Sequence, residues 1–434
     1  MKGITTLAAA LFAASIAKAE PYCADLTNKG ALPERYAKTA PIYSDASSGW
    51  VFTKDQLKDR YDMDRSAQTM VQTISKEFAR RGVQLAIVVA PPRPIVAGQT
   101  RLDAAMGDAR YDLKAARASF DELVAGLAST GAIVPNLSDV ALVNDAIRGA
   151  FYFRRDTHWT TTGSAVSAIA LAQAVNTAAP DFFPNDGTFS NADLKPLDLI
   201  EEEGSLAKIV REVCGTSLGV ETAQAFDLTR ASGLLGNAAD SRAIALVGSS
   251  FSNRYKRDHY RFGEALARAF DADVENYSVS GGGPIGAIEA YVLSGALDRR
   301  EHALVIWELP YTERFNSSSF LRQLLGAIER QTKPVQSIGV DQGTGATAIK
   351  VANGTHLSGI EIVSADPRHQ HFRLEVRFDD GSKTKITLRR RRAVPSEMRA
   401  QSVFGSLAFF GSRKPVEVVV TPAKASVASE ISIY

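Results

Sequence analysis

The sequence predicts an α/β domain of three layers with a mainly parallel sheet, followed by a small β-sandwich. From about residue 55 to residue 330, helical patterns alternate with short, continuously apolar strands, which is typical of a parallel sheet covered by helices. After about Lys333 the helical patterns end, and apolar and polar residues alternate as in half-buried strands. With 434 residues, 45% of them hydrophobic, the chain can bury a large core, so a disordered tail is excluded.

The elements of the α/β domain, expected over residues 20–335, follow from apolar spacing. An apolar stripe from Ala67 to Phe78 predicts a helix that Gly82 ends, and Val83–Ala90 reads as the strand after it. A second stripe over Leu113–Leu127 predicts a helix. The remaining predicted elements are strands at Ala132–Val134, Ala243–Val247, Val274–Tyr277 and Leu304–Leu309 and helices near His259–Phe270 and Pro284–Leu297. Residues 178–240, rich in Pro, Asn, Asp and Gly, are expected to form a long insertion.

The C-terminal residues 340–434 are predicted to form the β-sandwich. Apolar residues alternate over Phe372–Phe378, and Asp379–Gly381 then reads as a hairpin turn. Ile386 and Leu388 alternate on the return strand. Val403–Phe410 and Val416–Val420 are also strand-like.

Residues 1–19 have the features of a cleaved signal peptide. Lys2 supplies the basic start, Ile4–Ile16 is apolar, and Ala17–Ala19 fits the small-x-small cleavage rule. The alternative is a short membrane anchor, but the run is shorter than the ~20 residues a spanning helix needs. No later segment is that long, so we expect export to the periplasm and no membrane span.

Two cysteines and a balanced charge narrow the functional classes. In an exported protein, Cys23 and Cys214 favour one disulfide, the alternative being two buried free thiols. The formal charge of +2 becomes zero once the signal peptide and its two lysines are removed, which gives no overall attraction to nucleic acid. No C-x-x-C motif and no histidine spacing indicates a metal site, so no metal and no other cofactor is expected.

Two short segments carry residue types suited to nucleophilic catalysis. Gly248–Ser252 follows the strand Ala243–Val247, where an open α/β sheet exposes a nucleophile at its carboxyl edge. Asp156 and His158 lie two residues apart, so the carboxylate can reach Nδ1 of the imidazole and leave Nε2 for Ser250. The alternatives are an ordinary βα turn with serine at the N-cap, and an Asp-x-His pair that ligates a metal.

The two motifs together resemble the SGNH-hydrolase-like acetyltransferases of bacterial exopolysaccharide export, the AlgJ/AlgX family. Asp156–Thr160 is similar to the family's Asp/His motif, and Gly248–Phe251 to its nucleophile motif. Further similar stretches are Pro91–Arg93, Ala115–Leu137 and Trp307–Pro310. The order of signal peptide, disulfide-containing catalytic domain and β-sandwich carbohydrate-binding module is also shared. The resemblance covers residues 20–330, and the C-terminal region in architecture only.

The resemblance implies a role for each matching residue. Ser250 would be the nucleophile that carries the acetyl group, His158 the general base and acid, and Asp156 the residue that orients the imidazole. The N–H of Ser250 would be one oxyanion donor and Gly282, within the glycine run 281–283, another. Ser249 and Ser252 are alternative nucleophiles whose positions fit the motif less well. Cys23 and Cys214 match the catalytic-domain disulfide.

Four residues are predicted to contact the substrate. The four are Arg93, Trp159, Tyr311 and Arg390, the last within the basic run Arg389–Arg392. This run would meet the carboxylates of a uronic-acid polymer, or else form a solvated basic edge strand.

The C-terminal region departs from the family pattern. No cysteine follows Cys214, so the module's own disulfide is impossible, and no tryptophan lies in this region to stack on a sugar.

The expected function is periplasmic O-acetylation of an anionic exopolysaccharide, with alginate as the expected polymer. The expected partners are that polysaccharide, an acetyl-donor protein and other periplasmic export and modification proteins, with the chain itself a monomer. The same triad would also serve a polysaccharide acetylesterase. A third hypothesis is a non-catalytic scaffold that binds polysaccharide within the export complex.

Overall fold

The computed structural model describes residues 20–180, 189–230, 243–253, 261–315, 318–340, 345–352 and 355–434. The predicted signal peptide, residues 1–19, lies outside the described residues, as do the parts 181–188 and 231–240 of the predicted insertion. Within the described ranges, no helix combines the length and the apolar character needed to cross a bilayer.

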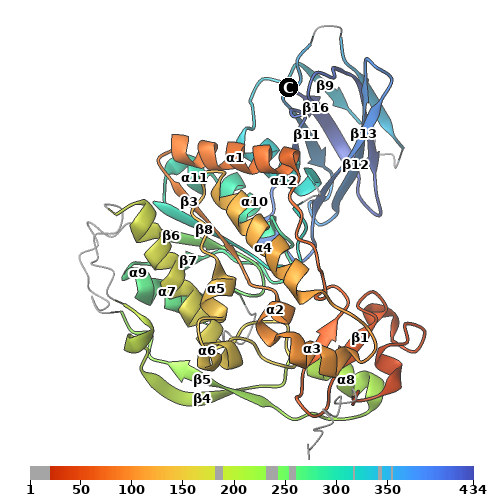
Figure 1. Cartoon of the computed structure of the whole chain (residues 1–434). Helices are drawn as coiled ribbons and strands as arrows, with labels where there is room; N and C mark the ends of the chain where they lie inside the picture. The colour runs from red at the N-terminus through yellow and green to blue at the C-terminus, as the bar shows by residue number, and fades with distance from the viewer. Residues whose placement is uncertain are drawn as a thin grey trace, which may run out of the picture.

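A four-stranded sheet forms the centre of the first domain (Figure 1). Its strands lie in the order β3 (Gln84–Val89), β8 (Leu304–Leu309), β6 (Ile244–Val247) and β7 (Val274–Asn276). All three pairings are parallel, and every residue of β6 and β8 is buried. The continuously apolar runs of the sequence are therefore explained by strands that are covered on both faces.

The helix before β3 shows how the sequence sets an element's limits. In α1 (Arg65–Arg80) the side chain of Asp64 caps the first turn by accepting the N–H of Ala67. The predicted apolar stripe from Ala67 to Phe78 is buried against the core. Gly82, with a φ of +73°, then turns the chain into the sheet.

The helices of this domain pack in two groups. One group brings α1 against α4 (Leu113–Ala128) and α12 (Ser318–Ile328), and α12 against α10 (Gly286–Leu293). The other pairs α7 (Thr161–Ala178) with α9 (Phe262–Phe270). Four shorter helices lie between β3 and α7: α2 (Arg93–Ala97), α3 (Gln99–Met106), α5 (Leu137–Ala141) and α6 (Asp145–Ala150). The predicted three-layer α/β domain is confirmed.

Two predicted elements differ in the structure. The strand expected at Ala132–Val134 is reduced to one parallel bridge between Ile133 and Ala86, because Pro135 cannot donate to a ladder and Asn136 already caps α5. The single helix expected over Pro284–Leu297 is split into α10 and α11 (Ala296–Arg299). Gly295, with a φ of +84°, interrupts it.

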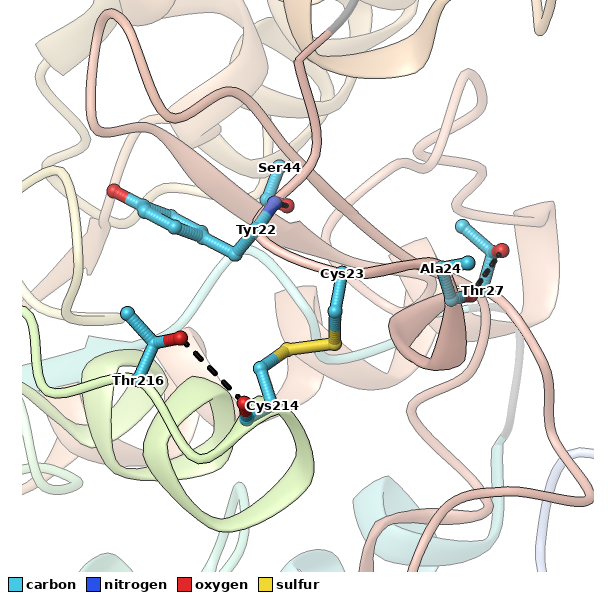
Figure 2. The surroundings of a disulfide bond; sticks show 7 residues. All are labelled: Tyr22, Cys23, Ala24, Thr27, Ser44, Cys214 and Thr216. Carbon is cyan, nitrogen blue, oxygen red and sulfur yellow. Dashed lines mark hydrogen bonds between the residues drawn. A yellow bond between two sulfur atoms is a disulfide. The ribbon is translucent and has the colours of Figure 1, made fainter.

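The described part of the predicted insertion contains a β-ribbon and a helix. β4 (Pro196–Glu202) and β5 (Glu221–Phe226) pair antiparallel, and α8 (Ser205–Cys214) lies between them in sequence. Cys214 at the end of α8 forms a disulfide with Cys23, as predicted (Figure 2). The helix also packs with the N-terminal segment that includes β1 (Ile42–Ser44) and β2 (Val51–Thr53) in a small core of its own.

The C-terminal module is built from two four-stranded antiparallel sheets around a separate core (Figure 1). The first has the order β10 (Thr347–Lys350), β15 (Pro415–Pro422), β12 (Gln370–Phe378), β13 (Lys383–Arg390). The second has the order β14 (Ser402–Ser406), β11 (Gly359–Ser364), β16 (Ala428–Ile433), β9 (Gln336–Gly339). The predicted hairpin is β12–β13, turning at Gly381 with a φ of +77°. Because β9 pairs with β16, this β-rich module begins before residue 340, where the sequence placed its start.

Buried polar contacts fix the module to the α/β domain. Arg390 of β13 forms an ion pair of 3.0 Å with Glu289 of α10, and both side chains are buried. Arg322 of α12 donates to the carbonyl oxygens of Ser406 and Phe409. A charge left unpaired at such a depth is costly, so both pairings resist separation of the two parts.

Candidate active site

Ser250 lies in the turn that follows β6, at the carboxyl edge of the sheet. β6 is an inner strand, between β8 and β7, so the turn opens where neighbouring loops converge. Gly248 begins this turn because a Cβ there would lie 2.5 Å from Oε2 of Glu308. Ser250 is half-buried and lies at the edge of the sheet, above the closely packed Gly248 and Glu308.

The structure brings Asp156, His158 and Ser250 together in one hydrogen-bonded chain. Nε2 of His158 lies 2.8 Å from Oγ of Ser250, and Nδ1 lies 2.5 Å from Oδ1 of Asp156. The carboxylate is fully buried and the imidazole is 8% exposed. Since an ionised carboxylate only accepts, Nδ1 carries the proton that faces Asp156, and Nε2 is left to accept the hydroxyl proton of Ser250.

Local backbone geometry explains how Asp156 and His158, only two residues apart, bring their side chains into contact. The backbone N–H of His158 donates to Oδ1 of Asp156 over 2.9 Å, closing a tight turn that puts both side chains on one side. The other oxygen, Oδ2, accepts the N–H of Ser205 over 2.5 Å. Ser205 is the first residue of α8, so the positive end of a ten-residue helix faces the carboxylate.

Gly204 permits this close approach of α8. It has a φ of +83°, and a Cβ at this position would lie 2.2 Å from the carbonyl oxygen of Arg155. The same carbonyl accepts the N–H groups of Leu206 and Ala207. Sequence reasoning missed the role of α8, because its acidic, loop-like surroundings indicated only an insertion.

Three residues that were predicted to contact the substrate have buried side chains. Trp159 has no exposed surface, and its indole N–H donates to the carbonyl oxygen of Phe251. Arg93 is also fully buried and donates to the carbonyl oxygens of Phe153 and Arg154, which holds the segment before Asp156. Tyr311 is 2% exposed.

The fourth, Arg390, is buried as well, and its guanidinium pairs with Glu289 at the junction with the module. Its neighbours in the basic run behave differently. Arg389, Arg391 and Arg392 are exposed. Alternation along β13 explains the difference between Arg389 and Arg390, whose side chains point to opposite faces, whereas Arg391 and Arg392 follow the end of the strand.

The turn offers one free oxyanion donor, the N–H of Ser250. Across the described ranges, no acceptor is found for this group, although the N–H groups of Ser252 and Asn253 both donate to the carbonyl of Ser249. The N–H of Gly282 donates to the carbonyl of Val279 over 3.0 Å. The prediction that Gly282 completes the oxyanion hole is therefore not supported, because its donor is used within its own turn.

Glu308 of β8 lies beneath the nucleophile turn and was missed by sequence reasoning about the site. Its carboxylate accepts from the N–H and Oγ of Ser249 and from Oγ of Ser252. Burial raises the pKa of Glu308, and these hydrogen bonds act in the opposite direction. Both alternative nucleophiles are thus engaged with Glu308. The available signal was a carboxylate inside an otherwise apolar strand.

A basic cleft lies where the α/β domain meets the C-terminal module. It has a volume of about 610 Å³ and is lined on the domain side by Lys54, Lys58 and Arg314, and on the module side by Arg389 and Arg391. Burial, with the nearby Arg314, lowers the pKa of Lys58 to about 8. These cations come from separate segments, so only the arginine run was visible in the sequence.

The cleft borders the loop that supports the nucleophile turn. Gly282 and Pro284 are among its lining residues. In the same loop, the N–H of Val279 donates to the carbonyl of Gly248 over 3.0 Å. The hydroxyl of Ser280 donates to the carbonyl of Asn253.

No group of three or more His, Cys, Asp or Glu side chains that would hold a metal ion occurs in the part of the chain that the structure describes. The hydrogen-bonded Asp156–His158–Ser250 chain has the arrangement of groups that acid–base and nucleophilic catalysis requires.

Comparison with known proteins finds a family that this chain matches. The model of the SGNH hydrolase-like domain of the acetyltransferase AlgX matches residues 45–311. The chain is 26% identical to the alginate biosynthesis protein AlgX of Pseudomonas putida over 374 residues, which cover 83% of this chain and 74% of the relative. It is 27% identical to the probable alginate O-acetylase AlgJ of the same organism over 320 residues, covering 67% and 75%.

The fold is also found among solved structures. That of Pseudomonas aeruginosa AlgX superimposes with a TM-score of 0.71 at 20% sequence identity, covering 95% of this chain and 99% of the other. The matched family model spans more than half of the chain, including Asp156, His158 and Ser250. This protein therefore belongs to the AlgX family of SGNH hydrolase-like acetyltransferases.

Proposed function

We propose that this protein is a periplasmic O-acetyltransferase that acetylates an anionic exopolysaccharide, with alginate as the expected polymer. The observation that carries the proposal is the hydrogen-bonded chain from Asp156 through His158 to Ser250 at the carboxyl edge of the sheet. Family membership supports the acetyl group as the group transferred. The names of the relatives connect them with alginate biosynthesis, which supports the choice of polymer.

The first half of the proposed reaction forms an acetyl-serine. Oγ of Ser250 attacks the acetyl carbonyl of the donor while Nε2 of His158 takes the hydroxyl proton. The carbonyl oxygen becomes an oxyanion that the N–H of Ser250 stabilises, an effect typically worth about 3 kcal/mol for one donor. Collapse breaks the bond to the donor, which leaves with the proton from His158. Asp156 holds the imidazole in the required tautomer and stabilises its charged form.

The second half transfers the acetyl group to the polymer. A sugar hydroxyl loses its proton to His158 and attacks the acetyl-serine, and Oγ of Ser250 leaves with that proton. The basic cleft supports an anionic acceptor. Its guanidinium and ammonium groups supply local positive charge that the chain as a whole lacks, and arginine forks match carboxylates well.

The compartment and the partners are part of the same proposal. The disulfide between Cys23 and Cys214 supports an oxidising compartment such as the periplasm. A donor protein would bring the acetyl group, and export proteins the polymer, to a monomeric enzyme. No cofactor enters the reaction as written.

The test is incubation of the protein with an activated acetyl ester and short mannuronate oligomers. We expect oligomers heavier by whole acetyl groups, detected by mass spectrometry, because the sugar hydroxyl resolves the acetyl-serine. Release of acetate with unmodified oligomers would instead identify an acetylesterase. Polymer binding without any ester turnover would identify a scaffold.

A pH dependence of polymer binding follows from Lys58. Its ammonium is charged below its pKa of about 8 and neutral above it, so the attraction to a carboxylate is present below that pH and lost above it. The charged groups that face it are Arg314, Glu313 and Asp55. Burial raises the pKa of Glu313, and the nearby Arg391 and Lys58 act in the opposite direction. We expect affinity for mannuronate oligomers to fall about tenfold from pH 7 to pH 9, measured calorimetrically at constant salt.

The control for this dependence is Lys58→Arg, whose guanidinium stays charged throughout the range. It should bind with little change between pH 7 and pH 9. Lys58→Met should bind weakly at both pH values. A fall in affinity that persists in the arginine variant would contradict the role given to Lys58.

A further inference from the structure

Glu308 is the one carboxylate that directly supports the turn carrying Ser250, as far as the described residues show. It lies on β8, beside β6 in the sheet, and is 1% exposed. Its oxygens accept the N–H of Ser249 at 2.7 Å, Oγ of Ser249 at 3.0 Å and Oγ of Ser252 at 2.9 Å. All of its hydrogen-bond donors among the described residues therefore come from the turn Ser249–Ser252.

Such a carboxylate is costly to bury and has no stabilising ion pair. Among the described residues, no lysine, arginine or histidine forms a salt bridge with it, in contrast to Glu289, which pairs with Arg390. An apolar side chain of similar size would cost less at this position. A buried carboxylate beside a nucleophile, held by hydrogen bonds without a salt bridge, indicates that these hydrogen bonds serve the geometry of the turn.

The hydrogen bonds hold the N–H groups of the residues on either side of Ser250, Ser249 and Phe251. The N–H of Ser249 points down to the carboxylate. The hydroxyl of Ser249 donates to the same carboxylate and accepts the N–H of Phe251 over 3.2 Å. Between these two inward-pointing groups, the N–H of Ser250 is left without an acceptor in the described chain, so it stays available to a reacting carbonyl.

We propose that Glu308 is a positioning residue for acylation, holding the turn so that the N–H and Oγ of Ser250 face the same acetyl carbonyl. The inference rests on the proposed function only as far as Ser250 is the nucleophile, because acylation is common to acetyl transfer and ester hydrolysis. Preorganised donors accelerate such a step because no reorganisation is needed as the oxyanion forms.

The test is pre-steady-state turnover of p-nitrophenyl acetate by the whole protein. In Glu308→Gln one acceptor oxygen becomes an amide donor that faces the donors of the turn, at nearly unchanged size. We expect the acylation rate constant to fall about 10- to 100-fold, while the ester concentration that gives half of the maximal burst rate stays within about twofold. The burst amplitude per mole of protein should also stay within about twofold as long as acylation is faster than deacylation. The matched control, Ser252→Ala, removes one hydroxyl donor and leaves both contacts of Ser249, so its rate constant should stay within about threefold.

The readout separates positioning from folding. If Glu308 only stabilised the fold, the burst amplitude would fall with the folded fraction and the rate constant would not change, and that result would overturn the proposal. A wild-type rate constant in Glu308→Gln would overturn it equally. Should Glu308→Gln not fold, Ser249→Ala removes the hydroxyl that joins the carboxylate to the N–H of Phe251, and it should show the same slowed burst.

The proposed function fails differently. If the wild-type protein acylates Ser250 but transfers nothing to sugar, the role of Glu308 can still be measured from the burst. If the wild-type protein shows neither a burst nor any turnover of the ester, Ser250 is not acylated, and the proposed function and the role of Glu308 are both refuted.

Discussion

Replacing Ser250 with alanine is expected to lower acetyl release from p-nitrophenyl acetate by at least about 10³-fold, to the level given by binding and the remaining groups. The reason is that Oγ of Ser250 is the atom within 2.8 Å of Nε2 of His158, and no other hydroxyl of the turn is free to replace it. The side chain is half-buried and makes no contact that the core requires, so the melting temperature should change little.

The measurement is steady-state turnover together with mass spectrometry of the intact protein after a short exposure to the ester. Wild-type protein should gain one acetyl group on the peptide that contains Ser250, and Ser250→Ala should gain none there. Ser249→Ala is unsuitable as a control because it alters the turn, whereas Ser252→Ala keeps the nucleophile. Turnover by Ser250→Ala close to that of the wild type would show that Ser250 is not the nucleophile.

Replacing Asp156 with asparagine is expected to lower turnover by about 10³- to 10⁴-fold while the protein stays folded. The carboxylate accepts Nδ1–H of His158, which leaves Nε2 free to accept from Ser250. When the amide oxygen of an asparagine accepts the N–H of Ser205, its NH₂ takes the place of Oδ1, faces Nδ1 of His158 and favours the tautomer with the proton on Nε2. That tautomer cannot take a proton from Ser250.

The matched control for Asp156→Asn is Thr157→Ala. The hydroxyl of Thr157 also lies near Nδ1 of His158, at 3.1 Å, but it carries no charge and is partly exposed. Its loss should reduce turnover by less than about tenfold. Melting temperatures of both variants check that the folded fraction is unchanged. Equal losses in the two variants would contradict the special role of the carboxylate.

The parts of the site that are local in sequence were accessible to prediction. Asp156 and His158 close a turn by themselves, and Ser250 follows a strand whose apolar run is unmistakable. Their approach to 2.8 Å depends on strand order, which the sequence indicates only through the parallel α/β pattern and the family resemblance. The fold class follows from the same periodicities.

Whether a charged side chain is buried could not be predicted from the sequence in the same way. Arg93 and Arg390 lie next to motifs and look like ligands for an anion, but both are buried. Their partners come from far along the chain: carbonyl groups such as that of Phe153 for Arg93, and Glu289 for Arg390. Burial of a charge is decided by such non-local partners, so residue type and neighbouring sequence do not reveal it.

The arrangement around α8 has a consequence for the order in which the protein assembles. The first N–H of α8 meets Asp156, and its last residue is joined to Cys23, 191 positions earlier in the chain. Between these ends the helix packs in a small core with the N-terminal segment, away from the main sheet. A nascent chain that has made Asp156, His158 and the first strands still lacks the group that holds Oδ2. The site is thus completed late, by closure of a long loop, and a chain truncated before α8 would contain two of the three key side chains without a finished carboxylate site.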